Sequence, residues 1–312
     1  MPNKKLKIIF FGTPEFAVPF LDILIKSFDV LGVITQPDRP SGRKQTMTPP
    51  PVKILALKNN IKVFQPETIK NNSEITRGIE KLKPDLAVVV AYGEMIPNDI
   101  LNIPKFKTIN VHPSLLPKYR GASPVQSAIL NGDKKTGVSI MLLDDKMDHG
   151  PILAQTEVLL KGDETNESLH NTLANTGKDF LLEVIEKYTK GELNPCDQKH
   201  ERATYCKEIE KSNAKINWNE TAEIIERKIR AFYPWPIAWT TFDGKRVKLF
   251  SPTEIKQAST GASKTITEKD SLLIGCKDKF LQINKLQLEG KNQVTAKEFI
   301  SSYSNIDNIA ID

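Results

Sequence analysis

The N-terminal stretch constrains the fold more than any other part of the chain, because it reads as a strand, a helix and a second strand in direct succession. Lys7–Phe11 is a short, continuous apolar run of the kind found in strands buried on both faces. Glu15–Ser27 carries apolar residues at helical spacing, and Asp29–Thr35 is again strand-like. A crossover helix is the connection that parallel strands need, so the sequence predicts an α/β fold with a mostly parallel sheet.

The turn after the first strand favours a simple structural interpretation. Gly12-Thr13-Pro14 ends the apolar run, and Gly12 suits either a tight turn or a close approach to a ligand. The sequence contains no G-x-G-x-x-G motif, which argues against dinucleotide binding.

The alternation of strands and helices continues to about residue 191, and the pattern then changes. Residues 192–214 are polar, of mixed charge and without a clear period, which is typical of a linker. Beyond them, a helix at Glu220–Phe232 precedes short β-like runs, and Asp243-Gly244 is a hairpin signal. We therefore predict a first domain at 1–191, a linker at 192–214, and a second domain with a small β-barrel at 215–312.

Composition and charge exclude several classes of protein. A chain of 312 residues suggests about two domains, and no apolar run approaches the length of a bilayer-spanning helix. No cleavable small-residue site follows the N-terminus, so we expect no signal peptide. Cys196, Cys206 and Cys276 are widely spaced and odd in number, which argues against a disulfide framework and favours a cytoplasmic setting. The net charge of +6 permits a polyanionic partner without requiring one.

A long polar loop at residues 36–51 interrupts the first domain. It contains five prolines and the cations Arg39, Arg43 and Lys44. A loop of this length in a compact domain is usually functional or disordered, and the sequence leaves both interpretations open.

The candidate active site begins where the strand at Thr108–Val111 ends. Asn110 and His112 are two residues apart, so an extended backbone places both side chains on one face. A later loop contributes Asp148, and Gly150 beside it allows close backbone approach. Together, an amide donor, an imidazole and a carboxylate suit direct transfer of an acyl group to an amine. The alternative is that Asn110 and His112 only bond backbone groups in a turn.

The remaining histidines and acidic residues do not predict a metal site. His149, His170 and His200 have no metal-ligand spacing, which favours structural or surface roles. Asp144, Asp145 and Asp148 lack the regular alternation of a calcium-binding loop. We therefore expect no metal ion.

Several motifs together resemble the folate-dependent formyltransferases, and within them the branch that acts on methionyl-tRNA. The resemblance runs from about residue 6 to beyond residue 300. It rests on Asn110-Val111-His112-Pro113-Ser114-Leu115-Leu116-Pro117-Lys118-Tyr119-Arg120-Gly121-Ala122, Asp148-His149-Gly150, Phe11-Gly12-Thr13-Pro14-Glu15-Phe16-Ala17, Arg230-Ala231-Phe232-Tyr233-Pro234-Trp235-Pro236, Gln36-Pro37-Asp38-Arg39-Pro40 and Pro51-Val52-Lys53. One departure is Ile237, which stands where the resemblance predicts glycine.

The resemblance implies a reaction, in which the formyl group of 10-formyltetrahydrofolate passes to the α-amine of methionine on initiator tRNA. By the same resemblance, Asn110 would stabilise the oxyanion, His112 would transfer a proton, and Asp148 would orient and polarise His112. It also implies a Rossmann-like first domain and an OB-like, tRNA-binding second domain. The folate site would be lined by Ser114, Leu115, Leu116 and Pro117, and the loop with Arg39, Arg43 and Lys44 would approach the tRNA.

Three alternative functions remain at this point. A formyltransferase acting on an amino sugar nucleotide would share the Asn110, His112 and Asp148 set, although the basic loop favours a large anionic acceptor. A folate- or RNA-binding protein without catalysis is disfavoured by the intact set, and an oxidoreductase by the missing glycine motif. The second domain is nearly balanced in charge, with 16 Lys and Arg against 14 Asp and Glu from Glu208 to Asp312. The sequence indicates no membrane and no obligatory protein partner.

Overall fold

The computed structural model describes residues 5–42, 44–302 and 311. These residues form two compact units that interleave along the sequence. The first unit takes the chain up to Gly121, Thr136–Leu159 and His170–Cys206. The second takes Ala122–Lys135, Leu160–Leu169 and the chain from Lys207 onward.

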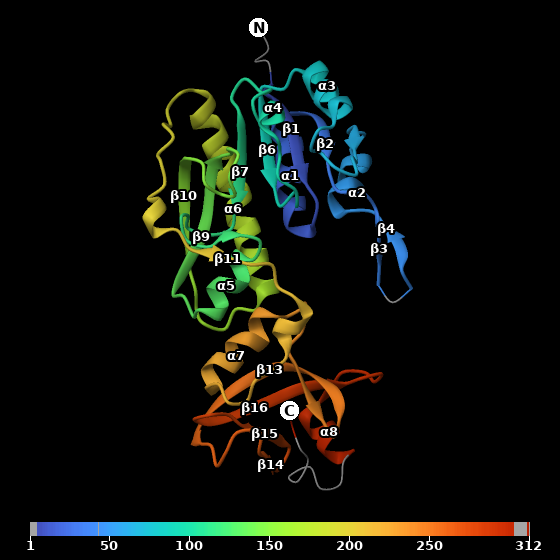
Figure 1. The fold of residues 1–312 in the computed structure, drawn as a ribbon, viewed down its shortest axis with the longest axis vertical. Coiled ribbons are helices and arrows are strands. Elements are labelled where there is room, and N and C mark those ends of the chain that lie inside the picture. The colour runs from blue at the N-terminus through green and yellow to red at the C-terminus, as the bar shows by residue number, and fades with distance from the viewer. Residues whose placement is uncertain (1–4, 43, 303–310, 312) are drawn as a thin grey trace. The chain divides into compact units, whose positions relative to one another are not determined.

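A seven-stranded sheet forms the centre of the first unit, in the order β10-β9-β7-β6-β1-β2-β5 (Figure 1). Its strands are β1 (Lys7–Gly12), β2 (Asp29–Ile34), β5 (Val63–Phe64), β6 (Leu86–Val90), β7 (Thr108–His112), β9 (Lys135–Leu142) and β10 (Ile152–Leu159). The strands β1, β2, β5, β6 and β7 run parallel, and β9 runs antiparallel to β7. The predicted α/β fold with a mostly parallel sheet is confirmed.

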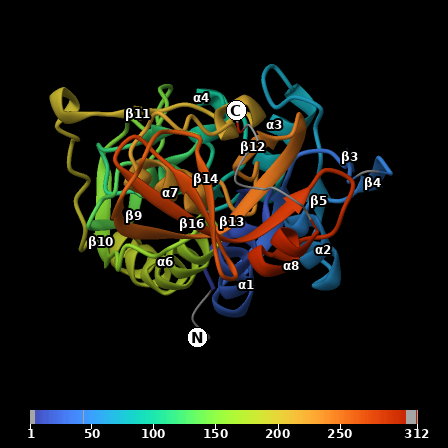
Figure 2. The ribbon, with the colours of Figure 1, turned by 90° about the horizontal axis from the view of Figure 1, so that it is seen from below.

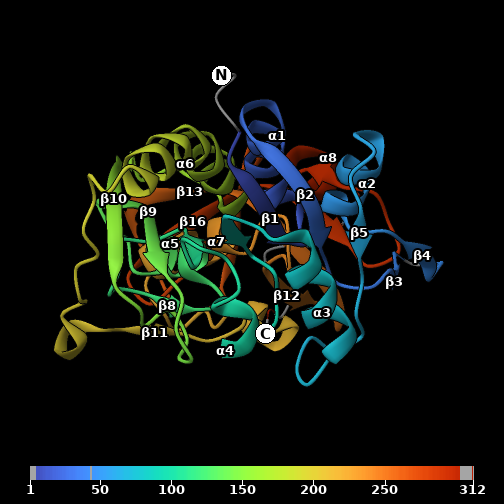
Figure 3. The same ribbon diagram turned by 90° about the horizontal axis from the view of Figure 1, so that it is seen from above.

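Helices cover both faces of this sheet. Figure 3 shows α1 (Val18–Ser27) and α6 (Asn166–Thr189) on one side, and α3 (Ser73–Leu82) and α4 (Asn98–Leu101) on the other. The helix α2 (Pro51–Lys58) packs against α1, and a short 3-10 turn at Glu15–Ala17 precedes α1. Within the described ranges, no helix has both the length and the apolar character needed to cross a bilayer.

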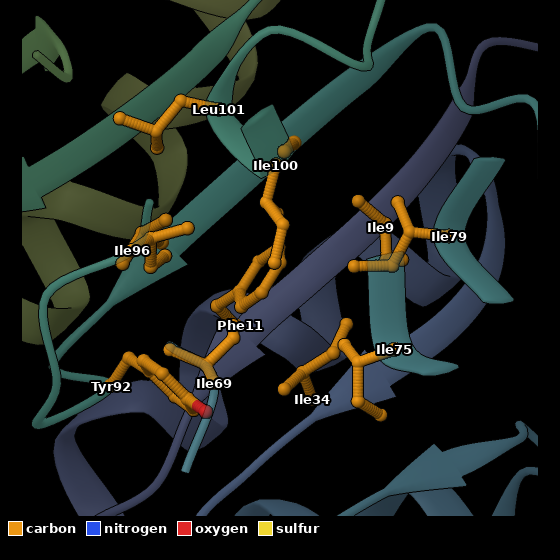
Figure 4. Packing of buried hydrophobic residues seen from close by; sticks show 12 residues of the cluster. Ile9, Phe11, Ile34, Ile69, Ile75, Ile79, Tyr92, Ile96, Ile100 and Leu101 are labelled. Carbon is orange, nitrogen blue, oxygen red and sulfur yellow. The ribbon is translucent and has the colours of Figure 1, made fainter. Parts of the chain in front are cut away.

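Alternate residues of β1 fill two different parts of the core. Ile9 and Phe11 belong to a cluster that includes Ile75 and Ile79 of α3 (Figure 4). The intervening Ile8 and Phe10 are also fully buried, so β1 is covered on both faces. This explains why its sequence is continuously apolar instead of alternating.

The second unit is built around an antiparallel sheet in the order β12-β13-β16-β15-β14, with β17 beside β16. Its elements are α5 (Pro124–Leu130), α7 (Ala222–Ala231), β12 (Trp239–Phe242), β13 (Lys245–Ala258), β14 (Thr265–Glu268), β15 (Ser271–Gly275), β16 (Lys279–Leu288), β17 (Val294–Thr295) and α8 (Ala296–Ser301). In Figure 2 the long strands β13 and β16 lie side by side across the unit. The predicted separate β domain is thus present.

Local turn chemistry in the second unit follows the sequence closely. Phe242 pairs with Lys245, and the two residues between them have positive φ values of 51° for Asp243 and 70° for Gly244. This is the two-residue hairpin that the Asp-Gly pair predicted. Ile237 has a φ of 71°, a region that glycine occupies without steric cost. The expectation of glycine at this position therefore has a backbone reason.

The polar segment at 192–214 forms defined contacts with the first unit up to Cys206. Within it, β11 (Tyr205–Cys206) pairs with β8 (Arg120–Gly121), and Cys196 forms a bridge with Ile152. The segment up to Cys206 therefore packs in the first unit, through backbone and polar contacts that leave no apolar period in the sequence. The domain boundaries at 1–191, 192–214 and 215–312 stay a prediction.

Candidate active site

The strand β7 brings Asn110 and His112 into the interior of the first unit. It lies between β6 and β9, and all of its residues are buried. Asn110 is 8% exposed and His112 is 4% exposed. Because the two residues alternate on an extended strand, both side chains leave the same face of the sheet, as the spacing predicted.

The imidazole of His112 lies between two acceptors. Its Nε2 atom is 2.9 Å from the carbonyl oxygen of Tyr119, and its Nδ1 atom is 3.6 Å from Oδ2 of Asp148. The carbonyl can only accept, so Nε2 carries a proton and donates. A neutral ring has one N–H and satisfies one acceptor, whereas the protonated ring has an N–H for each. The ring is thus held by the Tyr119 carbonyl on one side and faces the Asp148 carboxylate on the other.

Asp148 lies in the loop between β9 and β10, close to His112. Its Oδ2 atom also accepts a hydrogen bond of 2.8 Å from the backbone N–H of Gly121. Gly150 follows in the same loop, where a Cβ atom would lie 2.1 Å from the carbonyl oxygen of Leu142. The loop therefore needs glycine at this position to pass so close to β9.

Asn110 differs from His112 and Asp148 because its side chain has no hydrogen-bond partner among the described residues. Among the residues that the structure describes, no hydrogen bond involves its amide group. Asn110 is mostly buried as a residue, but its amide atoms are not among the described buried side-chain atoms that lack a partner, so they remain accessible. Its N–H groups are available to an oxygen atom of a bound molecule.

The stretch after β7 is held by several hydrogen bonds. Oγ of Ser114 donates to the carbonyl oxygen of Lys118 at 2.6 Å, and the N–H of Leu116 donates to Oγ of Ser139 at 3.0 Å. Gln155 donates through Nε2 to the carbonyl oxygen of Leu116 at 3.0 Å. These hydrogen bonds fix the loop that starts two residues after His112. The loop contains the predicted folate-site residues Ser114, Leu115, Leu116 and Pro117.

The loop at 36–51 contains a small hairpin that the sequence did not predict. Its strands are β3 (Arg39–Ser41) and β4 (Thr46–Thr48), which form a projecting arm in Figure 1. Arg39 and Lys44 are exposed. Arg43, the third predicted tRNA-facing cation, lies outside the described residues.

A polar cluster at Asp38 anchors the base of this hairpin. The Oδ1 atom of Asp38 lies 2.8 Å from Nζ of Lys53 and 2.8 Å from Nε2 of Gln65. Gln65 also donates to the carbonyl oxygen of Gln36 at 3.0 Å. The hydrogen bond from Gln65 and the contact with Lys53 lower the pKa of Asp38 from its ordinary value.

The other histidines have partners of their own. Nδ1 of His149 is 2.7 Å from Oδ2 of Asp144, and its ring stacks on that of His200 at 4.1 Å. His170 packs edge-on against Phe16. In the described part of the chain, no group of three His, Cys, Asp or Glu side chains converges as metal ligands do.

Sequence reasoning missed the backbone groups that hold this site. The carbonyl of Tyr119 and the N–H of Gly121 contact His112 and Asp148, although both residues lie within the singled-out motif. A main-chain group has no residue-type signature. Only the positive φ of Gly121, 113°, leaves a trace in the sequence as a glycine.

The chain belongs to the formyl transferase family. Residues 5–185 match the family model for formyl transferase, and residues 208–304 match the model for its C-terminal domain. The resemblance inferred from the motifs is confirmed.

Two relatives that match nearly the whole chain are methionyl-tRNA formyltransferases. One from Sulfurihydrogenibium sp. (strain YO3AOP1) is 46% identical, over 96% of this chain and 97% of its own length. One from Enterococcus faecalis is 44% identical, over 95% of each chain.

Solved structures of sugar formyltransferases share the fold. The sugar 3N-formyl transferase WlaRD has a TM-score of 0.66 and 22% identity, over 92% of this chain and 99% of its own. An N-formyltransferase from Helicobacter canadensis has a TM-score of 0.68 and 21% identity, over 89% of this chain and 98% of its own.

Acid is expected to loosen the β3–β4 hairpin. The pKa of Asp38 is lower in the folded protein than in the unfolded chain. Its contribution to the stability of the folded hairpin is therefore fully present above the ordinary carboxyl pKa of about 4, and it is lost as the pH falls through the folded-state pKa. In an NMR titration, the amide signals of Thr46–Thr48 should therefore shift in acid. Asp38→Asn should give shifted signals already at neutral pH, whereas Asp22→Asn, which removes an exposed partner of Lys26, should not. Identical β4 signals in Asp38→Asn and the wild type would remove this anchor from the account.

Proposed function

We propose that this protein transfers the formyl group of 10-formyltetrahydrofolate to the α-amine of methionine carried by initiator tRNA. The observation that carries the proposal is the contact between His112 and Asp148 beside the unbonded amide of Asn110, in a chain that belongs to the formyl transferase family. The methionyl-tRNA formyltransferases that match nearly the whole chain support this acceptor.

The three polar residues divide the chemistry between them. Attack of the amine on the formyl carbon forms the new C–N bond and places negative charge on the formyl oxygen. The N–H groups of Asn110 donate to that oxygen, an interaction that strengthens as the charge develops. His112 takes the proton that the amine loses and returns one to the departing nitrogen of the donor. Asp148 orients the ring and stabilises its protonated form.

The reaction requires little beyond this set, because the amine is itself the nucleophile. No Ser or Cys in the motif has to form a covalent intermediate, and correct placement of the two substrates supplies much of the rate. We propose that the fixed loop of Ser114, Leu115, Leu116 and Pro117 lines the site of the folate donor. The loop starts two residues after His112, which supports this placement.

We further propose that the cations of the 36–51 loop approach the tRNA. Arg39 and Lys44 are exposed on or beside the β3–β4 hairpin, and phosphate groups attract such side chains irrespective of sequence. The proposal for Arg43 rests on its place in the same loop. A cytoplasmic location and the absence of an obligatory protein partner stay predictions.

The acceptor is tested by offering two amines in parallel. The protein is incubated with 10-formyltetrahydrofolate and either charged initiator methionyl-tRNA or an amino sugar nucleotide, and labelled formyl transfer is followed. We expect transfer to the tRNA and none above background to the sugar. Transfer to the sugar alone would replace the proposed function by the rival within the same family.

Replacing the cations of the hairpin should weaken the binding of tRNA and leave the binding of folate unchanged. In Arg39→Ala and Lys44→Ala, we expect KM for methionyl-tRNA to rise several-fold and KM for the folate to stay unchanged. Each variant should also reduce the salt dependence of tRNA affinity by about one unit of slope, since one phosphate contact is lost. Lys81→Ala, an exposed cation of α3, serves as the control. Unchanged tRNA kinetics and salt slope in both variants would make the hairpin a surface feature without a role in binding.

A further inference from the structure

A buried glutamine holds the backbone of the Asp148 loop. Nε2 of Gln198 donates to the carbonyl oxygens of Asp148, at 2.9 Å, and Gly150, at 2.8 Å. Gln198 is 5% exposed and comes from the polar segment after α6. Asp148 has a φ of 47°, a region that residues other than glycine seldom occupy and that surrounding contacts must maintain. The hydrogen bonds from the Gln198 side-chain amide to the carbonyls of Asp148 and Gly150 are such contacts, one on each side of His149.

The amide of Gln198 has only one possible orientation. Its Oε1 atom accepts hydrogen bonds from Arg120, at 2.7 Å from Nη2 and 3.2 Å from Nε. A guanidinium can only donate and a backbone carbonyl can only accept. The oxygen of the amide must therefore face Arg120, and its NH₂ group must face the loop. Turning the amide over would place like groups against each other on both sides.

Arg120 is itself fixed and almost fully buried, with 1% of its surface exposed. Its Nη2 atom lies 2.8 Å from Nδ1 of His200, and Nη1 lies 3.4 Å from the hydroxyl oxygen of Tyr205. Its backbone N–H donates to the carbonyl oxygen of Thr204 at 2.8 Å. The guanidinium thus connects the Asp148 loop, through Gln198, to the paired strands β8 and β11.

Three consecutive residues then reach three parts of the site. The carbonyl of Tyr119 accepts from His112, the side chain of Arg120 donates to Gln198, and the N–H of Gly121 donates to the Asp148 carboxylate. Asp148 is held through its carboxylate by Gly121 and through its main chain by Gln198. Both connections lead back to the same short strand, β8.

We propose that Gln198, oriented by Arg120, is a positioning residue that sets the place of the Asp148 carboxylate relative to His112. The inference rests on the proposed function, since it assigns Gln198 a part in the same reaction. Gln198 does not reach the reacting atoms and acts through Asp148. Its loss should lower the rate of transfer and leave the binding of both substrates nearly unchanged.

The substitution Gln198→Glu separates this role from a general structural one. A glutamate keeps the oxygen that Arg120 needs and adds a charge that strengthens that contact. It cannot donate to the carbonyls of Asp148 and Gly150, because an ionised carboxylate only accepts. The variant therefore retains the attachment to Arg120 and loses the hold on the loop, where a carboxylate oxygen now faces the two carbonyl oxygens.

The test combines steady-state kinetics, thermal unfolding and hydrogen exchange on the full chain. In Gln198→Glu, we expect kcat to fall roughly ten- to a hundredfold, as for a small misplacement of a catalytic group. KM for both substrates should stay within about twofold, and the unfolding midpoint should fall, because a carboxylate oxygen now faces two carbonyl oxygens. Exchange should rise in residues 143–151. Gln198→Met, which can bond neither side, should show the same loss of kcat with a lower unfolding midpoint.

Two controls decide whether the effect passes through Asp148. Asn194→Ala removes an exposed amide from the same segment and should leave kcat and exchange unchanged. In an Asp148→Ala background, adding Gln198→Glu should lower kcat no further, because a positioning residue has nothing left to position. The inference would be overturned if Gln198→Glu lowered kcat as much in the Asp148→Ala background as it does in the wild type. It would also be overturned if Gln198→Glu alone had the kcat and hydrogen exchange of the wild type. Either result would leave the proposed function standing. Absence of formyl transfer by the wild type would overturn the proposed function, while the exchange measurement would still test the hold on the loop.

Discussion

The contact between the Asp148 carboxylate and the His112 ring is the interaction on which the proposed chemistry of the first unit depends. The two residues come from β7 and from the loop between β9 and β10, and 3.6 Å separates Oδ2 from Nδ1. A carboxylate and an imidazole are useful together only if their separation is fixed. Much of the surrounding structure serves this purpose: a buried strand carries the ring, and glycines at 121 and 150 let the main chain pass close by.

This arrangement explains why the site uses backbone groups so heavily. The carbonyl of Tyr119 and the N–H of Gly121 are placed by the main chain and cost no side-chain entropy to position. Of Asn110, His112 and Asp148, only Asn110 has side-chain N–H groups without a partner among the described residues. In the proposed function, the Asn110 amide donates to the formyl oxygen beside the fixed pair of His112 and Asp148 while the amine attacks the formyl carbon.

Much of the fold could be predicted from the sequence, because its determinants are local. Continuous apolar runs marked the parallel strands, and Asp243-Gly244 marked a hairpin with two positive φ values. Asn110 and His112 could be paired from their spacing alone, and Asp148 came from a loop rich in turn residues. The functional assignment needed the combined motifs, since spacing alone left a structural interpretation open.

What escaped sequence reasoning depends on contacts between distant segments. Gln198 lies in a stretch without periodicity, and its partners Asp148 and Arg120 are 50 and 78 residues away. The β3–β4 hairpin is short and polar, so it leaves no apolar alternation, and its anchor at Asp38 depends on Lys53 and Gln65. In both cases polar side chains replace apolar burial, so composition does not show that the segment is held in a fixed place.

The measurement that tests the central claim most directly is the single-turnover rate of formyl transfer to methionyl-tRNA in a cycle of His112→Ala, Asp148→Ala and the double variant. If the two residues act as one unit, each single variant should be slowed by roughly a hundredfold or more, and the double variant should be little slower than the worse single one. Penalties that multiply in the double variant would show that His112 and Asp148 act independently. Rates close to that of the wild type would show that neither takes part in the transfer.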